Sequence, residues 1–300
     1  MSSAELDAIL SSARAVAFDP GAAEKPLRER MDRMSDLFPV SPAIDISEVV
    51  LGGVRAERLV GGGEGPIVLY LHGGGYVMGS PQSHRHLAAK LAGDISGEVI
   101  SLDYRMAPEA PFPAALDDVV AAYRELSAST IDHDVFLAGD SAGGGLVFAA
   151  AAAIRDAGLP LPTGLVAISP WVNLGTENSS YDLLSYADPM LSRAVCDYFS
   201  SRYLSGHSPR DPAASPLYAK LEGLPRTLIQ VGDRECFFGD ATLMHQALIA
   251  AGVDTELRVW KEMFHVWHLY WPVLTQGREA VSEIAAFMRS ARSEHVSKSL

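Results

Sequence analysis

The chain has 300 residues, is 48% hydrophobic and carries a formal net charge of −13. Its length can bury a full core in one large domain with an accessory part, and its acidic balance disfavours binding to nucleic acid or anionic lipid. The only cysteines, Cys196 and Cys236, form no C-x-x-C pair, so we expect no bound metal and no disulfide framework. The N-terminus lacks a basic segment followed by an apolar one, and no apolar run is long enough to cross a bilayer. We therefore expect a cytoplasmic protein without integral membrane association.

Short β-rich runs alternate with helical patterns along most of the chain. Residues 44–50 and 55–60 flank Gly52-Gly53 and predict an antiparallel hairpin. The alternation predicts an α/β fold, with a mostly parallel sheet covered by helices on both faces. The further predicted strands are 67–71, 99–102, 135–138, 165–169, 227–231 and 256–260, and the predicted helices are 83–95, 114–126, a segment from 142 to near 158, 240–251 and 271–290.

Two regions interrupt this alternation. Residues 1–42 are amphipathic, with apolar residues at helical spacing, and residues 176–213 are rich in aromatic residues. Neither region is needed to build the sheet. We expect them to form a cap over the carboxyl ends of the strands, where such sheets place their sites. The apolar residues of the first region are Leu27, Met31, Met34, Leu37 and Phe38, and the aromatic residues of the second are Tyr181, Tyr186, Tyr198, Phe199 and Tyr203.

Gly139-Asp140-Ser141-Ala142-Gly143 matches the pattern G-x-S-x-G and lies between a strand-like run and an alanine-rich run. In that context the pattern is typical of a nucleophile elbow, a tight turn that exposes a serine hydroxyl at the top of a sheet. The pattern alone is common, and an ordinary glycine-rich connection would be the better interpretation if no other motif supported it.

A second motif, His72-Gly73-Gly74-Gly75, follows an apolar run upstream. Acyl transfer passes through a tetrahedral oxyanion, which requires two or three N–H donors aimed at one point. Glycines can turn their amides inward because no Cβ restricts their backbone. We expect the donors to be Gly74, Gly75 and Ala142, and Gly73 could replace one of them.

A serine nucleophile needs a base, and the base needs a group that orients it. Enzymes with this elbow place the acid after the serine in the sequence, and the histidine after the acid. His265 follows the last predicted strand, where the chain returns to the top of the sheet, and is the predicted base. His268 lies three residues further on and is interpreted as a packed or capping residue.

The loop after residues 227–231 offers three carboxylates to orient this histidine. Asp240 is expected to be the N-cap of the following helix. Glu235 is favoured as the acid because three residues separate it from the strand, which gives it the reach to lie under His265. Asp233 lies nearer the strand end and stays open as the alternative.

These motifs carry a family resemblance. With Tyr104-Arg105-Met106-Ala107-Pro108-Glu109 between them, they resemble the hormone-sensitive-lipase-like esterases of bacteria. The similarity continues through Ser169-Pro170-Trp171 and Leu224-Pro225-Arg226. The resemblance implies an α/β-hydrolase fold with a helical cap, carboxylesterase activity and no cofactor. It divides the chain into the N-terminal part of the cap (1–42), a first part of the catalytic domain (43–175), a cap insertion (176–213) and a second part of the catalytic domain (214–300).

The chain departs from this family's usual pattern in two places. Glu235-Cys236-Phe237 stands where the family commonly has an Asp in a D-x-L-x-D stretch. Val266-Trp267 stands where many members have Gly-Phe after the catalytic histidine, so we expect Trp267 to narrow the alcohol side of the pocket.

Together these observations predict a serine esterase with Ser141, Glu235 and His265 as its triad. Its oxyanion hole is Gly74, Gly75 and Ala142, and its substrates are small esters with short acyl chains. A lactone hydrolase with the same triad is the nearest alternative, and a catalytically silent ligand-binding protein is an alternative from another class. The resemblance also makes a homodimer plausible, with the strand at 256–260 pairing across a two-fold axis.

Overall fold

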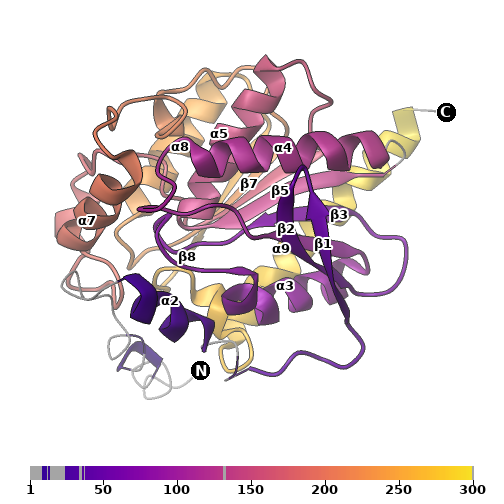
Figure 1. Cartoon of the computed structure of the whole chain (residues 1–300), viewed down its shortest axis with the longest axis horizontal. Coiled ribbons are helices and arrows are strands. Elements are labelled where there is room, and N and C mark those ends of the chain that lie inside the picture. The colour runs from indigo at the N-terminus through magenta and orange to yellow at the C-terminus, as the bar shows by residue number, and fades with distance from the viewer. Residues whose placement is uncertain are drawn as a thin grey trace.

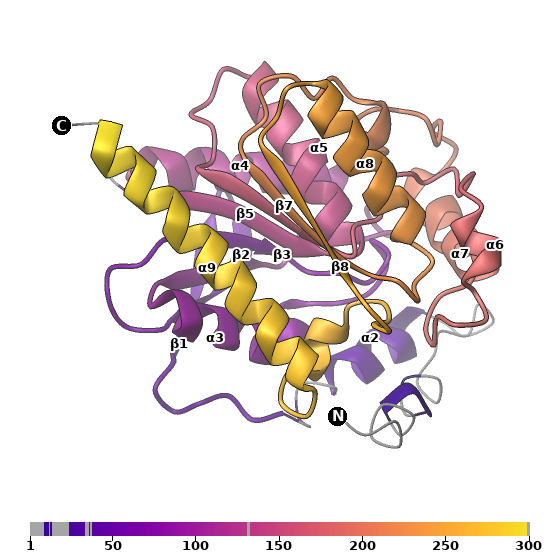
Figure 2. The ribbon, with the colours of Figure 1, turned by 180° about the vertical axis from the view of Figure 1, so that it is seen from behind.

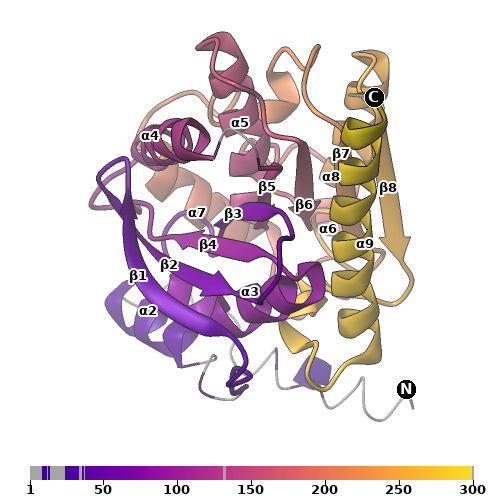
Figure 3. The same cartoon turned by 90° about the vertical axis from the view of Figure 1, so that its right-hand side faces the viewer.

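The computed structural model describes residues 9–11, 13, 24–33, 36, 38–130 and 133–298. Its centre is an eight-stranded sheet in the order β1-β2-β4-β3-β5-β6-β7-β8, and Figure 3 shows β1 and β8 at opposite edges. β2 runs antiparallel to both β1 and β4, and all other neighbours are parallel. The predicted α/β-hydrolase architecture is confirmed. The strands are β1 Asp45–Leu51, β2 Val54–Val60, β3 Ile67–Leu71, β4 Glu98–Leu102, β5 Val135–Asp140, β6 Gly164–Ile168, β7 Thr227–Gly232 and β8 Thr255–Trp260.

The predicted hairpin joins β1 to β2 through a two-residue turn. Leu51 pairs with Val54 across it, and the φ angles of Gly52 and Gly53 are 58° and 82°. Two consecutive positive φ angles define the turn whose twist matches the flanking strands, and glycine adopts them without a steric penalty.

Helices cover both faces of the sheet, as Figures 1 and 2 show from opposite sides. In β3, Leu69 and Leu71 pack into one apolar cluster with residues of α4, α5 and α8, whereas Val68 and Tyr70 pack into a second cluster with α3 and α9. Successive side chains of a strand point to opposite faces, so a strand buried on both faces is apolar throughout. The helices are α3 Pro81–Ile95, α4 Ala114–Ser129, α5 Ala142–Asp156, α8 Phe238–Ala250 and α9 Thr275–Lys298, with short 3₁₀ helices at Pro216–Tyr218 and Trp267–Tyr270.

In the residues that the structure describes, the two regions outside the alternation contribute further helices. These are α2 (Glu24–Asp32) and, within residues 176–213, α6 (Ser180–Leu183) and α7 (Arg193–Leu204). Figures 1 and 2 both place α2 and α7 at the same end of the molecule. Arg28 fastens α2 to the core, because its guanidinium forms a two-bond pair with Glu109 and donates to the carbonyls of Val77 and Ala107. Met34 and Leu37 of the predicted amphipathic pattern lie outside the described residues.

Three predicted helix starts shift in the structure. α3 begins at Pro81 instead of residue 83, α8 at Phe238 instead of residue 240, and α9 at Thr275 instead of residue 271. Among the described residues, no helix combines the length and apolar character that crossing a bilayer requires.

Candidate active site

Ser141 occupies the sharp turn between β5 and α5. Its φ and ψ are 55° and −120°, a conformation that non-glycine residues rarely adopt and that persists only where the surroundings enforce it. Here three backbone hydrogen bonds enforce it. The Ser141 N–H donates to the carbonyl of Ile168 at 2.8 Å, and its carbonyl accepts from Gly145 at 3.0 Å and Trp171 at 2.9 Å. The side chain is held at the carboxyl end of the sheet.

Gly143 explains why the motif ends in glycine. A Cβ at this position would lie 1.9 Å from the carbonyl oxygen of Leu71, the last residue of β3. The absence of a side chain lets the start of α5 approach the end of β3. As a result, the loop that follows β3 lies beside Ser141.

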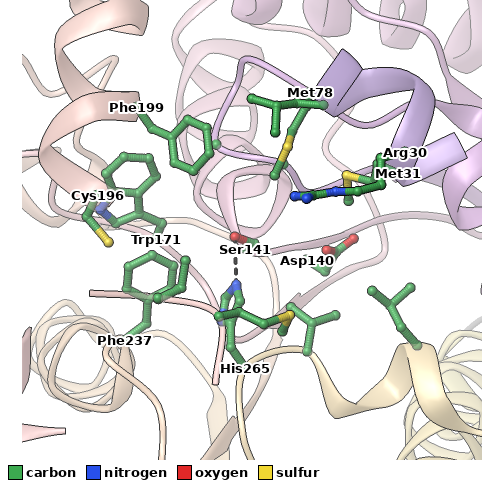
Figure 4. A pocket seen from close by; sticks show the side chains of 17 residues that line it. Arg30, Met31, Met78, Asp140, Ser141, Trp171, Cys196, Phe199, Phe237 and His265 are labelled. Carbon is green, nitrogen blue, oxygen red and sulfur yellow. Dashed lines mark hydrogen bonds between the residues drawn. The ribbon is translucent and has the colours of Figure 1, made fainter. Parts of the chain in front are cut away.

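Ser141, His265 and Glu235 form a continuous hydrogen-bonded chain. The Ser141 hydroxyl lies 2.9 Å from His265 Nε2, as Figure 4 shows, and His265 Nδ1 lies 2.7 Å from Glu235 Oε2. Donation by the hydroxyl to Nε2 and by Nδ1–H to the carboxylate satisfies all three groups with one histidine tautomer. The structure thus brings together the three residues that the sequence predicted as a triad.

Two further donors hold the carboxylate of Glu235, which is fully buried. Its Oε1 accepts from the Gly232 N–H at 2.6 Å and from the Ser169 hydroxyl at 2.9 Å. The Ser169 hydroxyl in turn accepts from the Val266 N–H at 3.2 Å, next to His265. Ser169 therefore connects the acid to the histidine loop. Its only signal in the sequence is its place in Ser169-Pro170-Trp171 after β6, a pattern that predicts no role for the hydroxyl.

The other two candidate carboxylates point elsewhere. Asp233 accepts from the Glu262 N–H at 2.6 Å and so ties the loop after β7 to the turn after β8. Asp240 lies inside α8, where it accepts from the Tyr181 hydroxyl at 2.8 Å. The expectation that Asp240 is the N-cap of this helix is wrong, because Phe237 takes that position without a side-chain cap. Burial raises the pKa of Asp240 to about 7.

The surroundings of His265 act on its pKa in opposite directions. Burial, the largest single influence, disfavours the imidazolium. The hydrogen bond and charge of Glu235, with the charges of Asp188 and Asp140, together outweigh burial and raise the pKa above its ordinary value. His268 contrasts with it: burial lowers its pKa to about 3, and its Nε2 lies 2.7 Å from Gln230 Oε1. It is a packed residue, as the sequence suggested.

The glycines after β3 form a loop whose amides divide between two tasks. The Gly73 N–H donates to Asp140 Oδ1 at 3.1 Å. Gly74 and Gly75 have φ angles of 117° and 64° and line the same pocket as Ser141, and within the described residues their N–H groups have no hydrogen-bond acceptor. Ala142 opens α5, where backbone N–H groups lack intrahelical partners. The geometry thus favours Gly74, Gly75 and Ala142 over Gly73 as oxyanion donors.

Asp140 is a buried anchor between the elbow and the glycine loop. Besides the Gly73 amide it accepts from the Tyr70 hydroxyl at 2.8 Å, and its Oδ2 lies 3.3 Å from His84 Nε2. Burial alone would raise the pKa of Asp140, but His84 and Tyr70 outweigh it and lower the pKa below its usual value. These contacts give Asp140 a structural role beside the nucleophile.

The pocket around Ser141 is mostly apolar, with about 880 Å³ of empty space when the open solvent at its mouth is included. Leu27 and Met31 reach it from α2, and Met190 and Leu191 from the segment before α7. Figure 4 shows two groups of side chains on either side of Ser141: Trp171, Cys196, Phe199 and Phe237 on one, and Arg30, Met31 and Met78 on the other.

One predicted pocket residue lies elsewhere. Trp267 is fully buried in the core and packs against Trp260 and His268, so the expectation that it narrows the pocket is wrong. Its neighbours Val266 and Leu269 line the pocket instead. The positive φ of Val266, 47°, turns the chain directly after His265.

Within the part of the chain that the structure describes, no group of three or more His, Cys, Asp or Glu side chains is arranged to hold a metal ion.

Known proteins share this architecture over most of the chain. A profile of the family described as alpha/beta hydrolase fold matches residues 68–269. The chain is 44% identical to an acetyl-hydrolase of Streptomyces hygroscopicus over 90% of this chain and 91% of the relative. It is 30% identical to an esterase of Acinetobacter venetianus over 89% of each. A crystal structure of an esterase from the bacterial hormone-sensitive lipase family matches with a TM-score of 0.93 and 40% identity, covering 97% of this chain and 99% of that one. The chain therefore belongs to the α/β-hydrolase family, among the hormone-sensitive-lipase-like esterases of bacteria, and is a carboxylic ester hydrolase.

Proposed function

We propose that the protein is a serine carboxylesterase that hydrolyses small, short-chain esters through an acyl-enzyme intermediate. The observation that carries the proposal is the hydrogen-bonded chain from Ser141 through His265 to Glu235, at the bottom of an apolar pocket. A serine hydroxyl is a weak nucleophile, and this arrangement supplies both the base that activates it and the carboxylate that orients the base.

In the first half-reaction, Ser141 Oγ attacks the ester carbonyl as its proton passes to His265 Nε2. Glu235 stabilises the imidazolium through the 2.7 Å contact to Nδ1, and the imidazolium then gives its proton to the leaving alcohol. In the second half-reaction, His265 takes a proton from the water that attacks the acyl group. The imidazolium then returns this proton to Ser141 Oγ as the ester bond to the serine breaks and the acid is released. The amides of Gly74, Gly75 and Ala142 hold the oxyanion of both tetrahedral intermediates.

The walls of the pocket support a preference for short acyl chains. Trp171 and Phe237 stack with ring centroids 5.6 Å apart, and both are almost fully buried, so they form a rigid wall beside Ser141. We place the acyl group against this wall and the alcohol group on the side of α2. The name of the acetyl-hydrolase relative agrees with this proposal. We further propose that residues 1–42 and 176–213 act as a cap, because both contribute side chains to the pocket.

Partitioning of the acyl group between water and methanol tests the mechanism. For acetyl esters of several different alcohols, the ratio of methyl acetate to acetate formed at one methanol concentration is expected to be constant, because all of them pass through the same acetyl-enzyme. The same assay with butyryl and octanoyl esters is expected to show turnover falling with chain length. A ratio that changes with the leaving alcohol would rule out a shared acyl-enzyme.

We also propose that two copies of the chain pair along β8. β8 is an outer strand, so one row of its backbone groups lacks a neighbouring strand. Val259 is 48% exposed on β8, and α8 beside it exposes Leu243 and Ile249. These apolar side chains would be covered by the same helix and strand of a second copy across a two-fold axis.

Light scattering after size-exclusion chromatography measures this assembly. The wild-type protein is expected at about twice the chain mass of 32.1 kDa, and Val259→Asp at the chain mass itself, because a buried unpaired carboxylate is costly. Val50→Asp is the matched control, since Val50 is 59% exposed on β1 at the opposite edge. A monomeric wild type, or dissociation by Val50→Asp alone, would contradict pairing through β8.

A further inference from the structure

Cys236 follows Glu235 in the sequence, and residues 176–213 contact it at both ends of its backbone. The Cys236 N–H donates to Asp188 Oδ2 at 2.9 Å, and its carbonyl accepts from the Ser180 hydroxyl at 2.6 Å. Its thiol points at the Leu191 carbonyl, with 3.5 Å between sulfur and oxygen. Three separate groups of the insertion thus surround a residue of the catalytic domain. None of these contacts belongs to the elbow or to the glycine loop.

Asp188 joins this contact to the wall of the pocket. Its Oδ1 accepts from the N–H groups of Met190 at 2.9 Å and Leu191 at 3.0 Å, and both of these residues line the pocket. The carboxylate is only 6% exposed, so its three N–H donors take the place of water. One buried carboxylate therefore fixes both a segment of the pocket wall and the peptide beside Glu235.

The peptide between Glu235 and Cys236 controls the backbone conformation of Glu235. The N–H of Cys236 belongs to the same peptide plane as the carbonyl of Glu235, so holding it fixes ψ of Glu235. The Ser180 hydroxyl holds the next peptide plane, which leads to Phe237. Phe237 packs edge-on against the His265 ring, with centroids 4.9 Å apart. The backbone on the C-terminal side of Glu235 is thereby held by residues 176–213, together with the Phe238 N–H, which donates to the Glu235 carbonyl at 3.2 Å. The Glu235 side chain is held by Gly232 and Ser169.

We propose that Asp188 and Ser180 are positioning residues that clamp the Cys236 peptide and so keep Glu235 aimed at His265. The clamp makes the triad dependent on the insertion, because a segment outside the sheet domain completes the support of the acid. The inference rests on the proposed function, in which Glu235 orients His265.

The charge of Asp188 gives the clamp a measurable signature. The charges of Glu235 and His265 act on the pKa of Asp188, and the charge of Asp188 acts on the pKa values of the Cys236 and Cys196 thiols. The pKa of His265 is influenced by the charges of Glu235, Asp188 and Asp140. As an anion, Asp188 favours the imidazolium and contributes to the raised pKa of His265. Its removal lowers this pKa. Because His265 must be neutral to accept the serine proton, the acid limb of kcat/KM then moves to lower pH.

Asp188→Asn is the principal variant, because it keeps the shape and removes the charge. Its amide has only one accepting oxygen, so it cannot accept from Cys236 on one side and from Met190 and Leu191 on the other. We expect kcat per titrated active site to fall about ten- to a hundredfold, the cost of a slight misplacement of a catalytic group. Ser180→Ala removes only the neutral contact, and we expect it to lower kcat several-fold without moving the acid limb. The control is Asp182→Asn on α6, whose carboxylate is exposed and paired with Arg193; it is expected to match wild type.

A double-mutant cycle with Glu235→Gln distinguishes positioning from general support of the fold. If Asp188 acts through Glu235, Asp188→Asn is expected to change kcat little once Glu235 is already replaced. A purely structural role predicts a lower melting temperature and fewer titratable sites, with kcat per site and the pH profile unchanged.

Three results would overturn the inference. The first is wild-type kcat and pH profile in Asp188→Asn, while Ser141→Ala is inactive; this result leaves the proposed function standing. The second is equal, additive losses from Asp188→Asn in the presence and absence of Glu235. The third, which applies if Asp188→Asn does not fold, is wild-type kcat in Ser180→Ala. If Ser141→Ala itself keeps its activity, the proposed function fails and the inference fails with it.

Discussion

Replacing Ser141 with alanine is expected to lower kcat/KM for acetyl and butyryl esters by about 10⁵- to 10⁶-fold, the scale seen when a triad nucleophile is removed. Alanine keeps the Cβ and the backbone bonds to Ile168 and Trp171, so the turn is expected to persist while the attacking oxygen is lost. The measurement is turnover of the ester series, joined with mass spectrometry after treatment with a fluorophosphonate. The wild type is expected to gain one adduct on the peptide that contains Ser141, and the variant none.

Ser101→Ala provides the control for this prediction. Ser101 is also a fully buried serine at the sheet, but it lies on β4. Its turnover and labelling are expected to match the wild type. Activity within tenfold of wild type in purified Ser141→Ala, or an adduct on another residue, would contradict the assignment of Ser141 as nucleophile.

Much of the fold could be predicted because its signals are local. The apolar run of β3 and the Gly52-Gly53 turn each require particular residue types at adjacent positions. The residue types of the elbow also lie within five adjacent positions, although Ser141 and Gly143 are fixed by contacts with Ile168, Trp171 and Leu71 far away in the sequence. Patterns of adjacent residues are visible in a single chain.

The rest depends on contacts between segments far apart in the sequence. Ser169 donates to Glu235 across 66 positions, and Asp188 accepts from Cys236 across 48, and neither pairing leaves a pattern in the sequence. Trp267 follows His265 by two residues, but the backbone turn at Val266 directs it into the core. A start of α8 only two residues earlier than predicted moved Asp240 from the cap into the helix.

The choice between Asp233 and Glu235 as the triad acid depends on local and on distant contacts. The sequence places both carboxylates in one loop, but only the folded structure shows which of them points toward His265. Glu235→Gln is expected to lower kcat about 10³- to 10⁴-fold, as the loss of a triad carboxylate does elsewhere. Where the NH₂ group of the glutamine faces His265 Nδ1, Nδ1 must accept a hydrogen bond, so the ring proton lies on Nε2. Nε2 then cannot accept the proton of the Ser141 hydroxyl. Kinetics with acetyl esters across the pH range measure both the loss in kcat and the position of the acid limb.

The pH dependence of Glu235→Gln is expected to differ from that of the wild type. Glu235 raises the pKa of His265 through its hydrogen bond and charge, against the effect of burial, so the wild type loses activity as the pH falls through that raised value. Without the carboxylate the pKa of His265 is lower, and the remaining activity of Glu235→Gln is expected to persist to lower pH. Asp233→Asn is the matched control, because its amide oxygen can still accept from the Glu262 N–H, and its kinetics are expected to match wild type. A large loss in Asp233→Asn, with Glu235→Gln close to wild type, would reverse the two assignments.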